Sequence, residues 1–180
     1  RLPGKVLKTI CNKTILEHVV ERLKKTKHIN SVVVATSNES TDDVLFNWCK
    51  SKNIHCFRGD ISNVLSRFYE SSCKYSADVI VRVTSDNPLV DPEIIDLAIK
   101  KYEENKFDMV TTCNKRSYPY GISVEVFSFA VLKESWKKSK LPSEREHVIL
   151  YIQNKKNNFR IFNLINSKDL THINCTVDNE

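Results

Sequence analysis

The sequence predicts an α/β protein, with a mostly parallel sheet and helices on both faces. Through the first hundred residues, segments with helical apolar spacing alternate with short β-branched runs, an order typical of parallel sheets. In the central stretch Asp78–Glu93, a β-branched run gives way to a polar loop and then to Asp91-Pro92, an N-cap and a first helical residue. A chain of 180 residues fills one core and is short for two domains. We therefore expect a single domain over residues 1–180.

Apolar spacing and capping residues place the elements of the first half. Thr14 and Glu17 form a capping-box pattern in front of the first amphipathic segment. The expected order is a helix from residue 15, a strand over 31–36, a helix capped by Thr41, a strand over 54–57, a helix around 64–69, a strand over 78–83 and a helix from Pro92.

The pattern changes after a short strand at Met109–Thr112. Residues 118–121 predict a turn, and residues 123–127 alternate like a strand with one polar face. A short helix around residues 131–136 follows, and a capping-box pattern at Ser143 and Glu146 predicts that SEREHVILYIQ is one helix. The last expected strands cover residues 159–165 and 173–177.

Two carboxylates follow predicted strands. Asp86 lies in the loop after residues 78–83, and Asp178 ends the last strand, in Thr176-Val177-Asp178. Ligands of open α/β sheets bind at the carboxyl ends of strands, so Asp86 stands where a carboxylate would hold a metal or a substrate group. Asp86-Asn87-Pro88 also has the composition of an ordinary turn, and both interpretations remain open on this loop alone.

Cations surround a rigid turn at the start of the sequence. Arg1 and Lys5 in RLPGK are spaced to grip a polyphosphate, or else they form an exposed basic terminus. The sequence holds only three glycines, and it lacks both G-x-G-x-x-G and the Walker phosphate loop. A nucleotide site here must therefore use side chains more than a glycine-rich loop.

The composition indicates which classes of binding partner to exclude. The formal charge of +6 comes mostly from lysine clusters near predicted helix ends, without aromatic interleaving or a groove-reading motif, so we expect no nucleic acid partner. No apolar run approaches the roughly 20 residues of a membrane span, so we expect no membrane partner. The six cysteines form no C-x-x-C and no zinc spacing, which indicates small buried side chains in a reducing cytoplasm. The tripeptide Arg58-Gly59-Asp60 matches an integrin-binding motif by chance.

The ordered motifs RLPGK, RVTSDNPLVDPE, SYPYGISVEVF, LPSEREHV and TVD resemble the spore-coat polysaccharide cytidylyltransferase family. That family is grouped with the synthetases of CMP-3-deoxy-octulosonate and CMP-sialate. The resemblance implies a three-layer fold like that of nucleotide-diphospho-sugar transferases. It also implies a reaction in which CTP and a sugar acid give a CMP-sugar and pyrophosphate with Mg²⁺, for surface polysaccharide synthesis. A homodimer is the assembly to test.

The resemblance also assigns roles to residues. It places Arg1 and Lys5 on the triphosphate, as the catalytic cations, and Thr84 and Arg67 near the nucleotide. It places Asp86 and Asp178 on the metal. The motifs expected to face the sugar hold Tyr118, Glu125, Glu144 and His147.

The chemistry of the proposed groups agrees with these roles. Transfer at an α-phosphate needs cations that spread the developing charge, and one or two carboxylates with phosphates are a common Mg²⁺ site. Some positions depart from the family pattern and leave the sugar open, namely Ser123, Ile149-Leu150, Asn63 and Ser66.

Two other functions remain open: a metal-dependent glycosyltransferase, although no D-x-D follows a strand, and a non-catalytic nucleotide-binding domain. The family's first strand and a further signature arginine are expected just before Arg1. We therefore expect an open position in the sheet beside residues 31–36 or 78–83.

Overall fold

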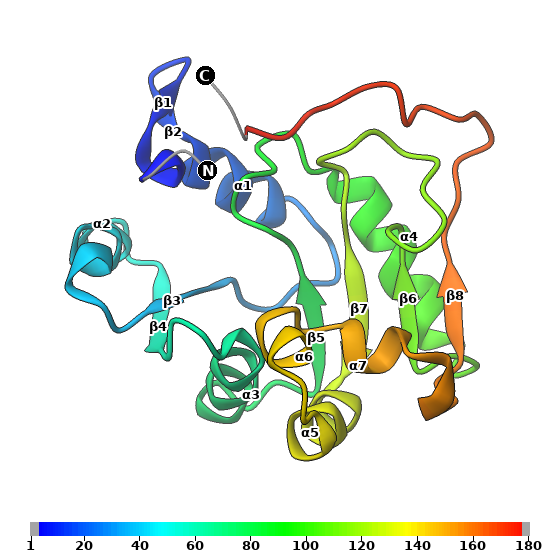
Figure 1. The fold of residues 1–180 in the computed structure, drawn as a ribbon. Helices are drawn as coiled ribbons and strands as arrows, with labels where there is room; N and C mark the ends of the chain where they lie inside the picture. The colour runs from blue at the N-terminus through cyan, green and yellow to red at the C-terminus, as the bar shows by residue number, and fades with distance from the viewer. Residues whose placement is uncertain (1–3, 178–180) are drawn as a thin grey trace. The chain divides into compact units, whose positions relative to one another are not determined.

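The computed structural model describes residues 4–177. Contacts divide the chain into two compact units. Unit 1 holds the chain up to Ser31, then Val81–Val126 and the chain from Ile161 on, and unit 2 holds Val32–Ile80 and Phe127–Arg160. Each unit mixes helices and strands (Figure 1). The single domain expected over residues 1–180 stays a prediction.

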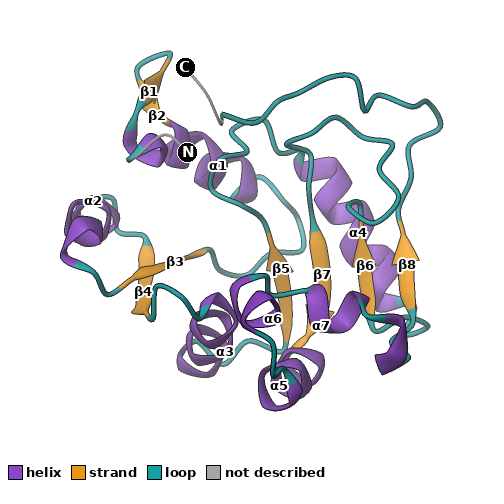
Figure 2. Ribbon diagram, viewed as in Figure 1, coloured by secondary structure: helices purple, strands orange, loops and turns teal. Residues whose placement is uncertain are grey.

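A four-stranded sheet with the order β5-β7-β6-β8 organises unit 1 (Figure 2). The residue ranges of the two units divide within β5 and within β7. Strands β6 and β8 are parallel, with Met109 beside Ile161. Strand β7 runs against β5, because Arg82 pairs with Glu125 while the Phe129 N–H donates to the Asp78 carbonyl. The bounds are β5 Val79–Arg82, β6 Met109–Thr111, β7 Glu125–Ser128 and β8 Ile161–Asn163.

Two helices and a small hairpin complete unit 1. Helix α1 (Ile15–Leu23) begins where Thr14 Oγ1 accepts the Glu17 N–H at 3.1 Å, as the capping pattern predicts. Helix α4 (Pro92–Glu103) has Asp91 as its N-cap and proline in its first turn, also as expected. A short 3₁₀ turn η1 (Lys5–Leu7) and the strands β1 (Thr9–Ile10) and β2 (Lys13–Thr14) precede α1.

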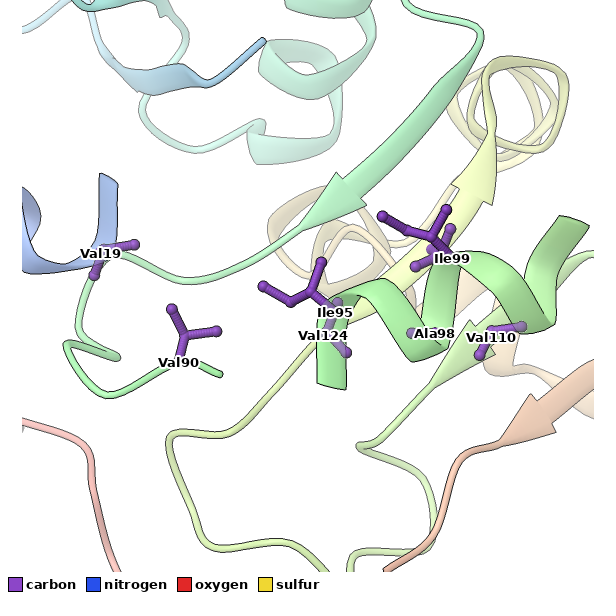
Figure 3. Packing of buried hydrophobic residues seen from close by; sticks show 8 residues of the cluster. Val19, Val90, Ile95, Ala98, Ile99, Val110 and Val124 are labelled. Atoms are coloured by element: carbon purple, nitrogen blue, oxygen red, sulfur yellow. The ribbon is translucent and has the colours of Figure 1, made fainter. Parts of the chain in front are cut away.

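The core of unit 1 forms where α4 packs on the sheet (Figure 3). Ile95, Ala98 and Ile99 lie on one face of α4 because of their helical spacing, and they form one cluster with valines of α1, of the loop before α4, and in or next to β6 and β7. The valines of the cluster are Val19, Val90, Val110, Val124 and Val126. Each fully buried side chain of this size contributes roughly 1.5–3 kcal/mol, so this cluster fixes the strand ends that carry the polar loops.

Unit 2 is built on the parallel pair β3 (Val33–Ser37) and β4 (His55–Gly59). Helix α2 (Asp43–Ser51) connects them and packs on β4, and α3 (Val64–Lys74) follows β4. Helix α5 (Phe129–Lys138) packs on α3, where the rings of Tyr69 and Trp136 stack at 4.1 Å. Two short helices, α6 (Pro142–Glu146) and α7 (Leu150–Gln153), and the 3₁₀ turns η2 (Ser40–Asp42) and η3 (Lys155–Asn157) complete it.

The sheet is mixed: β6 and β8 are parallel, as are β3 and β4, which agrees with the prediction of a mostly parallel sheet, while β7 is the reversed strand between β5 and β6. Among the described residues, β5 is at the edge of its sheet and β3 pairs only with β4. These are the two strands beside which the open position was expected. A further strand before residue 1 stays a prediction.

Three local expectations were wrong. SEREHVILYIQ is not one helix, because Glu144 Oε2 accepts the N–H groups of Lys140 and Leu141 and starts a helix that ends at Glu146. Thr41 does not cap α2, since it lies inside η2 and Asp42 is the N-cap. Residues 173–177 do not form a strand: they make a single parallel bridge, between Tyr120 and Asn174.

Candidate active site

A cation and a carboxylate meet at the loop that follows β5. Lys5 Nζ donates to Asp86 Oδ2 at 2.9 Å, with the side chains 13% and 27% exposed. Lys5 is presented by η1, whose N-cap Gly4 has φ 63°, a left-handed conformation that glycine adopts without strain. The sequence places the two residues 81 positions apart. The fold thus brings the expected phosphate-binding cation onto the expected metal-binding carboxylate.

The loop from Thr84 to Val90 is internally tied. Asn87 donates its backbone N–H to the Thr84 carbonyl, and Val90 donates to the Asn87 carbonyl. Asn87 is only 2% exposed, so the loop is anchored at the residue after Asp86. The segment is therefore a turn that presents the Asp86 carboxylate, and a metal or substrate group at that carboxylate stays a prediction. Thr84, the predicted nucleotide residue, is half-buried at the start of this loop.

The segment after β8 runs along the same edge of the sheet, drawn in orange to red in Figure 1. We call residues 164–177 the C-terminal strap. Its Leu170 N–H donates to the Ser117 carbonyl, and Tyr120 exchanges backbone hydrogen bonds with Ile173 and Cys175 at 2.9 and 2.7 Å. The Val177 N–H then donates to the Asp86 carbonyl at 3.1 Å. The strap therefore ties the loop before β7 to the loop that carries Asp86.

Gly121 allows this close approach. Its φ is +94°, and a Cβ at this position would lie 2.7 Å from the backbone carbonyl carbon of Cys175. Any larger residue would push the strap away. The sequence placed this glycine in a loop, but local reasoning could not show what presses against it.

Two predicted site residues lie outside the described chain, Arg1 and Asp178. Their roles, and the convergence of Asp86 with Asp178, stay predictions.

Glu125 lies at the start of β7 in a largely buried ion pair. Its Oε2 accepts from Arg82 Nη1 at 2.9 Å, and the two side chains are 5% and 19% exposed. Arg82 is not among the predicted site residues, although a charged residue inside the apolar run VIVRV is a signal in the sequence. A contact between Glu125 and a substrate stays a prediction.

The loop between β6 and β7 carries further polar side chains. The guanidinium of Arg116 lies 4.7 Å over the ring of Tyr120, and its Nη1 is 3.4 Å from Ser123 Oγ. Burial raises the pKa of the Tyr118 hydroxyl, and the charge of Asp91 raises it further. Tyr118 therefore stays protonated and can donate a hydrogen bond.

Three further predicted residues belong to unit 2. Glu144 is 8% exposed and accepts backbone N–H groups at the start of α6, while His147 is exposed directly after that helix. Burial lowers the pKa of Arg67, against the opposing effect of Asp42 and Asp60, and its Nε has no hydrogen-bond partner among the described residues. Their contacts with a nucleotide or sugar stay predictions.

The donor set around Asp86 fits a magnesium ion better than a protein-enclosed metal. Within residues 4–177 no three His, Cys, Asp or Glu side chains gather as a metal site. Mg²⁺ commonly takes one or two carboxylates and completes its octahedron with phosphate oxygens and water. The partly exposed carboxylate of Asp86 matches that sparse arrangement.

These features are those of an α/β fold with its polar loops at the carboxyl ends of β5 and β6. Solved structures show the same fold: a cytidylyltransferase from Leptospira borgpetersenii matches with a TM-score of 0.94 and 32% identity, over 99% of this chain and 76% of the other. A structure of CMP:2-keto-3-deoxy-manno-octonic acid synthetase complexed with CTP matches with a TM-score of 0.68 at 18% identity, over 92% of this chain and 85% of the other.

The sequence model of the family described as Cytidylyltransferase matches residues 1–176, and the chain belongs to that family. An uncharacterised protein from Methanocaldococcus jannaschii is 43% identical over 91% of this chain and 66% of its own length. The spore coat polysaccharide biosynthesis protein SpsF from Bacillus subtilis is 34% identical over 89% and 68%, respectively. The chain therefore spans about two thirds of the length of these relatives. No helix among residues 4–177 is long and apolar enough to cross a membrane.

Proposed function

We propose that the protein transfers CMP from CTP to a sugar acid and releases pyrophosphate, in the synthesis of a surface polysaccharide. The observation that carries the proposal is the 2.9 Å contact of Lys5 with Asp86. It supplies, at one point of the sheet edge, a cation for phosphate and a carboxylate for a metal ion. CTP and a sugar acid as partners, and a cytoplasmic location, belong to the same proposal.

Lys5 would act on the phosphates. Negative charge builds up on the leaving pyrophosphate during transfer, and a fixed cation is most effective against charge that develops in the transition state. When the triphosphate is bound, the Lys5 ammonium would turn from Asp86 to the phosphate oxygens. Arg1 would grip the same group by forked hydrogen bonds.

Asp86 and Asp178 would hold Mg²⁺. The ion would neutralise phosphate charge and orient the triphosphate for in-line attack. Support for the pairing comes from the strap, because Val177, the neighbour of Asp178 in the chain, is hydrogen-bonded to the backbone of Asp86.

The sugar acid is supported by relatives and by the loop between β6 and β7. Besides SpsF, a protein described as 3-deoxy-manno-octulosonate cytidylyltransferase from Solibacter usitatus is 33% identical over 64% of this chain and 45% of its own length. That loop presents Tyr118 and Arg116, a hydrogen-bond donor and a cation suited to hydroxyl and carboxylate groups.

The test follows pyrophosphate release by the full-length protein with CTP, Mg²⁺ and a panel of 2-keto sugar acids and sugar phosphates. We expect release that requires both CTP and one sugar acid of the panel, with a CMP-sugar as the second product. UTP, ATP and GTP in place of CTP are the matched controls. A protein that transfers sugar from a preformed nucleotide sugar, or that binds CTP without turnover with any acceptor, would contradict the proposal.

A further inference from the structure

Arg116 is an exposed cation on the loop between β6 and β7, and its contacts within residues 4–177 are uncharged. Its guanidinium lies 4.7 Å over the ring of Tyr120, and Nη1 donates to Ser123 Oγ at 3.4 Å. The next carboxylate along the chain, Glu125, is paired with Arg82 at 2.9 Å. The positive charge of Arg116 is therefore not compensated by a carboxylate of the described chain.

Hydrogen bonds fix the backbone on both sides of Arg116. The Lys115 N–H donates to Asn163 Oδ1 at 3.1 Å, at the end of β8. Ser117 Oγ accepts the Asn166 N–H at 2.7 Å, in the C-terminal strap. The loop is thus held against two other segments of unit 1, and the position from which the Arg116 side chain leaves the backbone is fixed.

The side chain is held as well as the backbone. The backbone of Tyr120 is bonded to Ile173 and Cys175 of the strap, and its ring supports one face of the guanidinium. A guanidinium carries several N–H donors in a planar fork. Ser123 occupies one of them, and the printed contacts within residues 4–177 leave Nε and Nη2 without an acceptor. A carboxylate is the group that fits such a fork with two parallel hydrogen bonds.

The same strap connects this loop to the loop of Asp86. Tyr120 is bonded to strap residues, and further along the strap the Val177 N–H donates to the Asp86 carbonyl at 3.1 Å. The loops that follow β5 and β6 lie at the edge of an α/β sheet where ligands bind. An anion held by Arg116 therefore lies on the same side of the sheet as the carboxylate proposed to hold the metal ion.

From this geometry we propose that Arg116 determines the acceptor specificity of the enzyme by binding the carboxylate of the sugar acid, with Tyr120 and Ser123 as its positioning residues. The inference rests on the proposed function and deepens it, because it assigns recognition of the acid group to one side chain. A neutral acceptor leaves the guanidinium fork without a partner and is disfavoured for that reason.

The test measures binding of 2-keto sugar acids, and of the matching uncharged sugar amides, to the full-length protein by isothermal titration calorimetry. The protein is used alone and loaded with Mg²⁺ and α,β-methylene-CTP, an analogue that cannot release pyrophosphate. We expect one acid of the panel to bind more tightly than its amide. Arg116→Gln should weaken binding of that acid by roughly 10- to 100-fold, the effect of losing a hydrogen bond to a charged group, and should leave binding of the amide unchanged.

Two further positions provide controls. Lys115→Gln removes the neighbouring exposed cation and should bind the acid like the wild type, which separates a specific contact from a general effect of charge. Ser123→Asp places a carboxylate beside Arg116 Nη1, so an internal ion pair should compete with the substrate and weaken acid binding while Arg116 is still present. Ser123→Asn has a similar size without the charge and should lose much less affinity.

The outcomes separate this inference from the proposed function. Acid binding that depends on Arg116, without pyrophosphate release from CTP, would support the inference and contradict the proposed function. Pyrophosphate release with an acid whose affinity is the same in Arg116→Gln and in the wild type would overturn the inference alone. The inference also fails if no acid binds the wild type more tightly than its amide, or if a sugar phosphate binds through Arg116 more tightly than every acid.

Discussion

Removal of the buried carboxylate of Glu125 tests whether its role is structural or catalytic. Glu125→Gln keeps the shape of the side chain and removes the charge that pairs with Arg82 at 2.9 Å. Breaking a buried ion pair from one side costs about 3–5 kcal/mol. Arg82 has a further contact, and the amide oxygen of the substituted side chain can still accept a hydrogen bond. We therefore expect a loss of about 2 kcal/mol in the free energy of unfolding.

Urea unfolding followed by far-UV circular dichroism measures that loss through the shift of the midpoint at constant slope. Glu104→Gln is the matched control, because Glu104 forms an exposed pair with Lys101 and its loss should leave the midpoint unchanged. The double variant Arg82→Met, Glu125→Leu should recover much of the stability, since apolar residues of similar volume replace both charges.

The opposite result is informative. If Glu125→Gln unfolds at the wild-type midpoint but loses pyrophosphate release, the carboxylate acts on substrate, as the family resemblance implies. The structural account of the pair would then be refuted.

Three further variants probe the loops and unit 2. Lys5→Met keeps the side-chain length without the charge and should lower the rate constant for chemistry by about 10²-fold or more, with a smaller effect on CTP affinity. The control is Lys13→Met, which breaks an exposed ion pair. A defect of Lys5→Met that is confined to CTP affinity would contradict this prediction. Gly121→Ala should lower the free energy of unfolding by about 1–3 kcal/mol and raise the Mg²⁺ concentration needed for activity, because the added Cβ would collide with the C-terminal strap. The control is Gly4→Ala, where φ is +63° but the space around the glycine is open, so the loss of stability should be smaller. Equal losses of stability in the two variants would refute the steric argument. Asp42→Asn should destabilise by about 1 kcal/mol at neutral pH. Burial raises the pKa of Asp42, but hydrogen bonds from Ser37 and Thr36 outweigh it and hold the pKa below its ordinary 3.8. The stabilisation should therefore be complete above the unfolded pKa and vanish as pH falls through the folded pKa; a wild-type to variant difference that does not shrink in acid, measured by urea unfolding across pH, would contradict this.

Local patterns were sufficient for most elements of the fold. Local residue patterns predict the alternation of helices and strands from α1 to α4. They also predict the N-cap at Asp91 and the N-cap at Thr14, because each cap depends on residues only a few positions apart. The sequence did not predict the interruption between α6 and α7. The predicted capping box paired Ser143 with Glu146, whereas in the structure Glu144 accepts the backbone N–H groups of Lys140 and Leu141 in front of α6. The apparent last strand pairs at one residue only, because the strap exchanges hydrogen bonds with a loop instead of a neighbouring strand.

The candidate site needed more than local patterns. The loop after a β-branched run pointed to Asp86, and resemblance to a family placed Lys5 on the triphosphate and Asp178 with Asp86 on the metal. The contact between them spans 81 positions, and the pair of Arg82 with Glu125 spans 43. Such long-range pairs depend on strand order, here the insertion of β7 between β5 and β6, which no local spacing encodes.

The central claim is that Asp86 binds the metal on which transfer depends. The direct measurement is the Mg²⁺ dependence of pyrophosphate release by full-length Asp86→Asn, with CTP and the accepted sugar acid. Asp96→Asn, which changes a half-buried aspartate of α4 that accepts the Lys27 N–H, is the control. We expect Asp86→Asn to lose turnover by about 10²-fold or more, with an apparent need for more Mg²⁺ and a nearly unchanged urea midpoint. Wild-type turnover and Mg²⁺ dependence in Asp86→Asn would contradict the claim, and so would an equal loss of activity and stability.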